Sequence, residues 1–115
     1  MSLQPAPDGY PIKLVRDRTA EIINASGEPG DLFYGPCPAG SHLRWLRQKL
    51  IEECAEYVID GTLAELADVL AVVEGLALLH GTNLDALVPT MRADIRGGFA
   101  DGVMMYGHHE EFDGR

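Results

Sequence analysis

Two acidic pairs in the middle of the chain have the residue types and the spacing of a metal site. Glu53 and Glu56 stand three residues apart, and so do Glu65 and Asp68. Residues three apart on a helix share a face, and a reversal of the chain at residues 60–62 would bring the two pairs together. Crowded carboxylates repel one another unless a cation binds them, and Mg²⁺ and Mn²⁺ prefer oxygen ligands. We therefore expect Glu53, Glu56, Glu65 and Asp68 to hold Mg²⁺, for which Mn²⁺ can substitute.

Two helices are expected to carry these pairs, over about residues 42–59 and about residues 63–80. Ser41 is the predicted N-cap of the first helix. Thr62 and Glu65 form the pattern of a capping box at the start of the second, which gives Glu65 an alternative, structural role. Successive residues of a helix are rotated by about 100° around its axis. On the first helix this places one strip of residues at the edge of the apolar face: Lys49, Glu53, Glu56 and Asp60.

Asp68 is the residue whose position most strongly indicates a site. The helix predicted over 63–80 is apolar almost all round, so we expect it to be buried on most sides. Asp68 shares a face with Val72, Gly75 and Leu79 and therefore interrupts an apolar stripe. Charged groups are seldom buried without a partner or a metal, and helix capping does not explain this residue.

The rest of the chain predicts further helices and no convincing strand. Helices are expected over about residues 15–24 and 84–95, the latter containing Pro89, with Gly81 ending the helix before it. Residues 25–41 are rich in glycine and proline and form a long loop, and residues 102–106 are the only candidate strand. Gly97 and Gly98 after Arg96 would let an anionic ligand approach the backbone, although a helix end explains them equally well.

Length and composition bound the class of protein. The chain has 115 residues, 46% of them hydrophobic, which predicts one domain over 1–115 with a core at about 12–100. The formal net charge of -9 argues against binding nucleic acid through a basic surface. The longest apolar run, residues 69–79, is too short to span a membrane. No apolar leader is evident, and with only two cysteines, Cys37 and Cys54, we expect a reduced, cytoplasmic protein.

Four segments resemble, in the same order, those of MazG-like proteins. The resemblance is to the small, phosphoribosyl-ATP pyrophosphohydrolase-like branch of the all-α nucleoside triphosphate pyrophosphatases, and it covers about residues 12–100. The matching segments are Lys13-Leu14-Val15-Arg16-Asp17 with Glu21-Ile22-Ile23, Lys49-Leu50 with Glu52-Glu53 and Glu56, Glu65-Leu66-Ala67-Asp68-Val69-Leu70, and Arg92 with Arg96-Gly97-Gly98-Phe99.

The resemblance implies a fold, a reaction and a setting. The fold would be an all-α helical bundle completed by oligomerisation, as a homodimer or a tetramer built from two dimers. The reaction would be hydrolysis of a nucleoside triphosphate between its α and β phosphates, giving the monophosphate and pyrophosphate. The substrate would be a deoxynucleoside triphosphate or a noncanonical nucleotide, removed in a house-cleaning role, with no nucleic acid polymer and no membrane as partner.

The resemblance also implies roles for individual residues. The four acidic residues would hold Mg²⁺, and Glu52 would orient or deprotonate the attacking water. Basic residues would meet the phosphates: Lys13, Arg16, Lys49, Arg92 and Arg96.

Two other functions stay open at this point. The same fold and chemistry could serve phosphoribosyl-ATP hydrolysis in histidine synthesis. Alternatively, the chain could be a helical nucleotide-binding or dimerisation module without turnover. His108 and His109 are of a type that binds metals, but their place near the chain end favours exposure to solvent.

Overall fold

A computed structural model of the chain describes residues 11–26 and 34–107. These residues form four helices, α1 (Thr19–Ser26), α2 (His42–Asp60), α3 (Leu63–Leu79) and α4 (Leu84–Arg92), and no strand. The all-α class is therefore confirmed for the described residues, in which residues 102–106 are not a strand. None of these helices is both long enough and apolar enough to cross a membrane.

The chain divides into two compact units, Met1–Leu84 and Asp85–Arg115. The first unit holds α1, α2 and α3, and the second holds nearly all of α4 and the segment after it. His108 and His109, and residues 27–33 of the predicted loop, lie outside the described residues.

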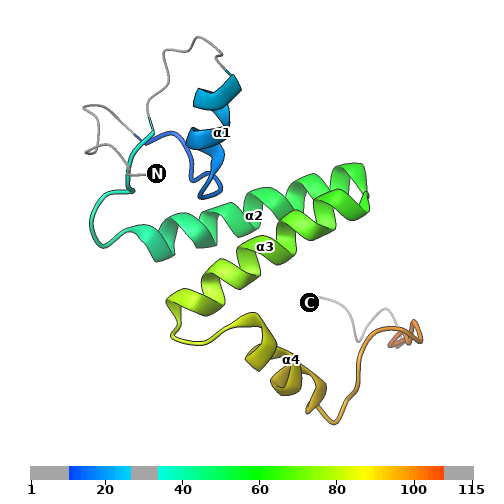
Figure 1. The fold of residues 1–115 in the computed structure, drawn as a ribbon. Helices are drawn as coiled ribbons and strands as arrows, with labels where there is room; N and C mark the ends of the chain where they lie inside the picture. The colour runs from blue at the N-terminus through cyan, green and yellow to red at the C-terminus, as the bar shows by residue number, and fades with distance from the viewer. Residues whose placement is uncertain (1–10, 27–33, 108–115) are drawn as a thin grey trace. The chain divides into compact units, whose positions relative to one another are not determined.

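Helices α2 and α3 form an antiparallel hairpin (Figure 1). Gly61 ends α2 in the left-handed conformation, with φ of 66°, and its N–H donates to the Tyr57 carbonyl at 2.7 Å. A residue without Cβ adopts this conformation at no steric cost. The Thr62 hydroxyl then accepts a hydrogen bond from the Glu65 N–H at 3.2 Å, which caps α3 as the sequence predicted. Two residues thus reverse the chain and fix where both helices meet.

The close contact between the helices lies at Leu46 and Gly75. A Cβ added at Gly75 would lie 3.3 Å from Leu46 Cδ1, which is tighter than ordinary contact. Leu46 is buried on α2, and Val72 and Ala77 are buried on α3. A small residue on one helix therefore receives a large residue from the other, and this contact sets the register of the hairpin.

The far end of α3 closes as its sequence predicted. Gly81 has φ of 80°, and its N–H donates to the Leu78 carbonyl at 3.1 Å. The Thr82 N–H reaches the Ala77 carbonyl at 3.0 Å. This pair of bonds is the Schellman arrangement, in which a left-handed glycine satisfies the last carbonyls of a helix.

Three helix ends differ from the prediction. Helix α1 starts at Thr19 rather than near residue 15, because Leu14 and Val15 become half-buried from a segment without regular secondary structure. Ser41 does not cap α2 with its side chain; its hydroxyl donates to the Pro38 carbonyl at 2.6 Å instead. Helix α4 ends at Arg92, before the predicted residue 95.

The early end of α4 has a local cause. The Asp94 carboxylate accepts a hydrogen bond from the Arg96 backbone N–H at 2.9 Å. Aspartate side chains that bond to the backbone two residues on compete with helix formation. The chain therefore turns at Asp94 where the apolar spacing alone predicted more helix.

The prediction that α3 is buried on most sides is wrong within this chain. Leu63 is 83% exposed and Leu70 is 52% exposed. Among the described helices, α2 is the one that packs on α3, and a single neighbour covers one face of a helix. An apolar surface therefore stays open along the hairpin.

Candidate metal site

The register of the hairpin brings the acidic residues face to face. Glu53 follows Leu46 by seven residues on α2, and Asp68 precedes Gly75 by seven residues on α3. Seven residues are about two helical turns, so Glu53 and Asp68 lie on the same faces as the Leu46–Gly75 contact. Glu56 and Glu65 follow three residues closer to the turn. We call these four residues, Glu53, Glu56, Glu65 and Asp68, the acidic ladder.

Three members of the acidic ladder form a tight cluster. Glu53, Glu65 and Asp68 each place a carboxylate oxygen within 4.8 Å of the other two. Ligand oxygens lie about 2.0–2.6 Å from Mg²⁺ or Ca²⁺, so two oxygens on opposite sides of such an ion are about 4–5 Å apart. The cluster therefore has the size and the all-oxygen chemistry that a hard divalent cation needs.

Two oxygens of the cluster lack hydrogen-bond partners in the part of the chain that the structure describes. Glu53 is 9% exposed, and its Oε2 atom is buried with no hydrogen-bond partner among the described residues. Oε2 of the half-buried Glu65 is in the same situation. A buried, unpaired carboxylate oxygen costs free energy. These orphaned oxygens fit a bound cation, whose charge would satisfy both.

Glu56 stands beside the cluster rather than in it. The pKa of the Glu65 carboxyl is raised above its usual value, first because partial burial disfavours the charged form. The negative charges of Glu56, Asp60 and Asp68 raise this pKa further, and so does a hydrogen bond with the Glu56 side chain. The predicted ligand Glu56 thus acts on Glu65, and a further carboxylate outside the acidic ladder, Asp60, adds to the same electrostatic repulsion.

Lys49 partly neutralises the α2 side of the cluster. Its Nζ atom lies 3.4 Å from Glu53 Oε1 and 3.4 Å from Glu52 Oε2. The Lys49 side chain is 19% exposed, so water screens these contacts less than at an open surface. Because Lys49 contacts both glutamates, Glu52 lies directly beside the cluster.

Arg16 partly neutralises the α3 side of the cluster. Its Nη2 atom lies 2.5 Å from Asp68 Oδ1, across 52 residues of sequence. Arg16 belongs to the irregular segment before α1, which this contact ties to α3. Sequence reasoning placed Arg16 at the substrate phosphates and missed its contact with Asp68, because no local spacing signals a pair so far apart.

Three further residues were predicted to meet the phosphates: Lys13, Arg92 and Arg96. Lys13 is exposed in the segment before α1. Arg92 and Arg96 both belong to the second unit. Arg96 donates to Asp94 through Nε at 3.0 Å and through Nη2 at 2.7 Å. These bonds from the Arg96 side chain, and then the one from its backbone N–H, hold the pKa of Asp94 below its usual value.

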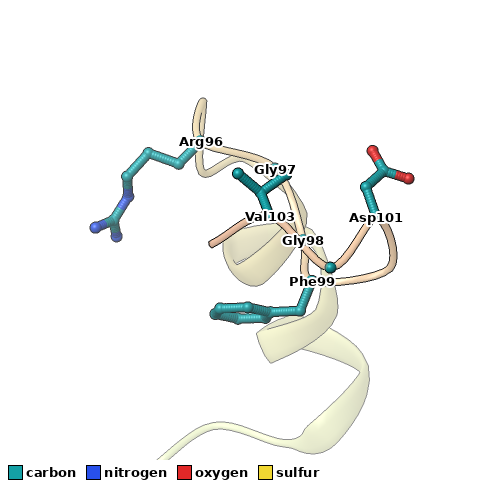
Figure 2. A pocket seen from close by; sticks show the side chains of 7 residues that line it. Arg96, Gly97, Gly98, Phe99, Asp101 and Val103 are labelled. Carbon is teal, nitrogen blue, oxygen red and sulfur yellow. The ribbon is translucent and has the colours of Figure 1, made fainter. Parts of the chain in front are cut away.

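A shallow hollow of about 360 Å³ lies in the second unit (Figure 2). Gly97 and Gly98 form part of its wall, while the Arg96 and Asp101 side chains point to opposite sides of the loop. Phe99 and Val103 are almost fully exposed. An open, mostly solvated hollow of this kind is a poor ligand site by itself, since small-molecule sites bury most of their ligand.

The chain matches no protein-family model, no curated protein and no solved structure. The MazG-like resemblance therefore stays a prediction.

Proposed function

We propose that the chain is a divalent-metal-dependent hydrolase. It converts a nucleoside triphosphate, a deoxynucleotide or a noncanonical one, to the monophosphate and pyrophosphate. The observation that carries this proposal is the cluster of Glu53, Glu65 and Asp68, with its two buried and unpartnered oxygens. A triphosphate is strongly negative, so an acidic cluster of this kind would bind it only through cations. The resemblance of short segments to those of MazG-like proteins is the reason for proposing cleavage between the α and β phosphates.

The residues of the hairpin, together with Arg16, would have different roles in this reaction. Glu53, Glu65 and Asp68 would hold Mg²⁺, with Glu56 completing the set from beside the cluster. When bound, the metal supplies charge for the phosphate oxygens and a more acidic water. Glu52, placed beside Glu53 by Lys49, would orient the attacking water and accept its proton. Lys49 and Arg16 would help to neutralise the pyrophosphate that leaves.

The open apolar surface of the hairpin supports a homo-oligomer. Leu63, Leu66 and Leu70 are exposed along one side of α3, and Ile51 and Val58 are exposed along α2. Large exposed apolar surfaces mark interaction sites in soluble proteins. A homodimer or a dimer of dimers would cover this surface and complete the core. Sedimentation should give more than one copy per particle, and Leu70→Asp should shift the protein towards monomer.

Product analysis tests the proposed reaction. The purified protein is incubated with canonical and noncanonical nucleoside triphosphates and with phosphoribosyl-ATP, in Mg²⁺, Mn²⁺ or EDTA. We expect metal-dependent release of pyrophosphate with the matching monophosphate, and none in EDTA. Glu53→Gln should reduce the release about 10–100-fold or more, whereas the matched change Glu74→Gln, at an exposed position of α3, should leave it intact.

Other products would point elsewhere. Orthophosphate in place of pyrophosphate would contradict cleavage between the α and β phosphates. Turnover of phosphoribosyl-ATP alone would favour the histidine-synthesis function. Nucleotide binding without any product, with both metals, would favour a non-catalytic module.

A further inference from the structure

Two basic side chains that differ in exposure, those of Lys49 and Arg16, form ion pairs with the acidic ladder. Lys49 sits one helical turn from Glu53 on the same helix, and its side chain is 19% exposed. Arg16 comes from a separate segment without regular secondary structure, and its side chain is 64% exposed. Lys49 therefore stays with the site whatever binds there, whereas Arg16 can leave at little cost, since exposed ion pairs contribute little to stability.

A metal ion bound to Asp68 would change the contact between Arg16 and Asp68. Asp68 offers one oxygen to Arg16, and a carboxylate oxygen of Asp68 also lies within the cluster formed with Glu53 and Glu65. A cation and a guanidinium beside the same carboxylate repel each other. The buried, unpartnered Oε2 of Glu53 is independent evidence that the cluster accepts a further positive charge.

We propose that Arg16 is an exchangeable counter-ion of the acidic ladder. In the metal-free protein Arg16 neutralises Asp68. When a divalent cation occupies the cluster, Arg16 leaves Asp68, and the guanidinium becomes available to a phosphate group of the substrate. Metal loading is thereby coupled to the position of residues 11–16. This inference rests on the proposed function, because it requires the cluster to bind a divalent cation.

The exchange predicts that removal of Arg16 tightens metal binding. Free Mn²⁺ is measured by electron paramagnetic resonance during titration of the full chain at low ionic strength. We expect Arg16→Ala, and equally Arg16→Gln, to bind Mn²⁺ about two- to fivefold more tightly, the factor by which an exposed ion pair would compete. Arg18→Ala is the matched control, since Arg18 pairs with Glu21 instead, and it should change affinity much less.

The background of Asp68→Asn separates direct exchange from general electrostatics. Asp68→Asn removes the carboxylate that Arg16 contacts, so the further change Arg16→Ala should then have no effect on Mn²⁺ affinity. An equal gain in both backgrounds, or an equal gain from Arg18→Ala, would overturn the exchange. Equal Mn²⁺ affinity of the wild type and Arg16→Ala would overturn it as well.

A second ligand tests where Arg16 goes. With Mn²⁺ saturating, Arg16→Ala should bind inorganic pyrophosphate several-fold more weakly in calorimetry, although it binds the metal more tightly. These opposite signs distinguish a transferred guanidinium from one that only repels cations. Unchanged pyrophosphate affinity would overturn the transfer to phosphate. Absence of Mn²⁺ binding in every variant, the wild type included, would overturn both this inference and the proposed function.

Discussion

The acidic ladder and the Asp94–Arg96 turn are two charged clusters built in opposite ways. In the turn, one carboxylate receives three bonds from one arginine, from Nε, Nη2 and the backbone N–H. In the acidic ladder, several carboxylates share two basic side chains, and two buried oxygens have no partner among the described residues. In the turn, the charge of Asp94 is balanced by Arg96, and both residues are exposed. The acidic ladder has more negative than positive charge and lies where α2 and α3 pack together.

This difference separates a structural ion pair from a candidate site. A balanced, exposed pair shapes the backbone and contributes little to stability. An unbalanced, half-buried cluster of charges destabilises the folded protein. Such clusters are found at functional sites, where a ligand interacts with the unbalanced charge. The predictions below perturb the acidic ladder and the helical hairpin that positions it.

The largest effect is expected from Glu53→Gln. Loss of one ligand oxygen should weaken Mn²⁺ binding, and with it turnover, about 10–100-fold or more. The free energy of unfolding in EDTA should change by less than about 1 kcal/mol or rise, because repulsion with Glu65 and Asp68 is relieved. Urea unfolding and a turnover assay measure the two effects. A loss of more than about 2 kcal/mol would assign Glu53 a structural role.

Gly75→Val tests the register that creates the ladder. The added side chain would meet Leu46 on the facing helix, so we expect a loss of about 1–3 kcal/mol in urea unfolding. Leu46→Ala alone should also destabilise, and the double variant should lose less than both changes added together. Full additivity would mean that the two residues do not share this contact.

A smaller effect is expected at the turn of the hairpin. Thr62→Ala removes the acceptor of the Glu65 N–H and should cost about 1 kcal/mol of unfolding free energy. Thr62→Ser keeps a hydroxyl and should retain most of the stability. If both variants unfold alike, the hydrogen bond contributes nothing and the hairpin depends on packing alone.

The smallest effect is a pH dependence carried by Glu65. Its pKa is raised in the folded state, so the folded protein holds this proton more tightly than the unfolded chain. The resulting stability is present below the unfolded value, near 4.5, and is lost as pH rises through the folded pKa. The gain from Glu65→Gln in EDTA should therefore grow between pH 4 and pH 7. Glu74→Gln, at an exposed position of the same helix, is the control, and a gain independent of pH would contradict the shift.

Features encoded within a few residues were predictable from the sequence. The Thr62 cap, the left-handed Gly81 and the two acidic pairs depend on neighbours in the chain, and the structure confirms the cap and the glycine. The start of α1 was not predictable, because Leu14 and Val15 are half-buried equally well from a segment without regular secondary structure. Nor was the Arg16–Asp68 pair, since it depends on where two distant segments meet.

The exposure of α3 shows a different limit of the sequence pattern. Apolarity all round a helix predicts that it is covered, but it does not say by what. Within this chain α2 covers one face, and Leu63 and Leu70 stay exposed. Composition therefore indicates an apolar environment that a second copy could supply.

Anomalous scattering from crystals grown with Mn²⁺ tests the central claim most directly. The account predicts a peak within about 2–2.6 Å of carboxylate oxygens from Glu53, Glu65 and Asp68, with Arg16 no longer on Asp68. Crystals of Glu53→Gln serve as the control and should show a weaker peak or none. Absence of a peak between these three carboxylates in the wild type at millimolar Mn²⁺, or a peak elsewhere alone, would contradict the account.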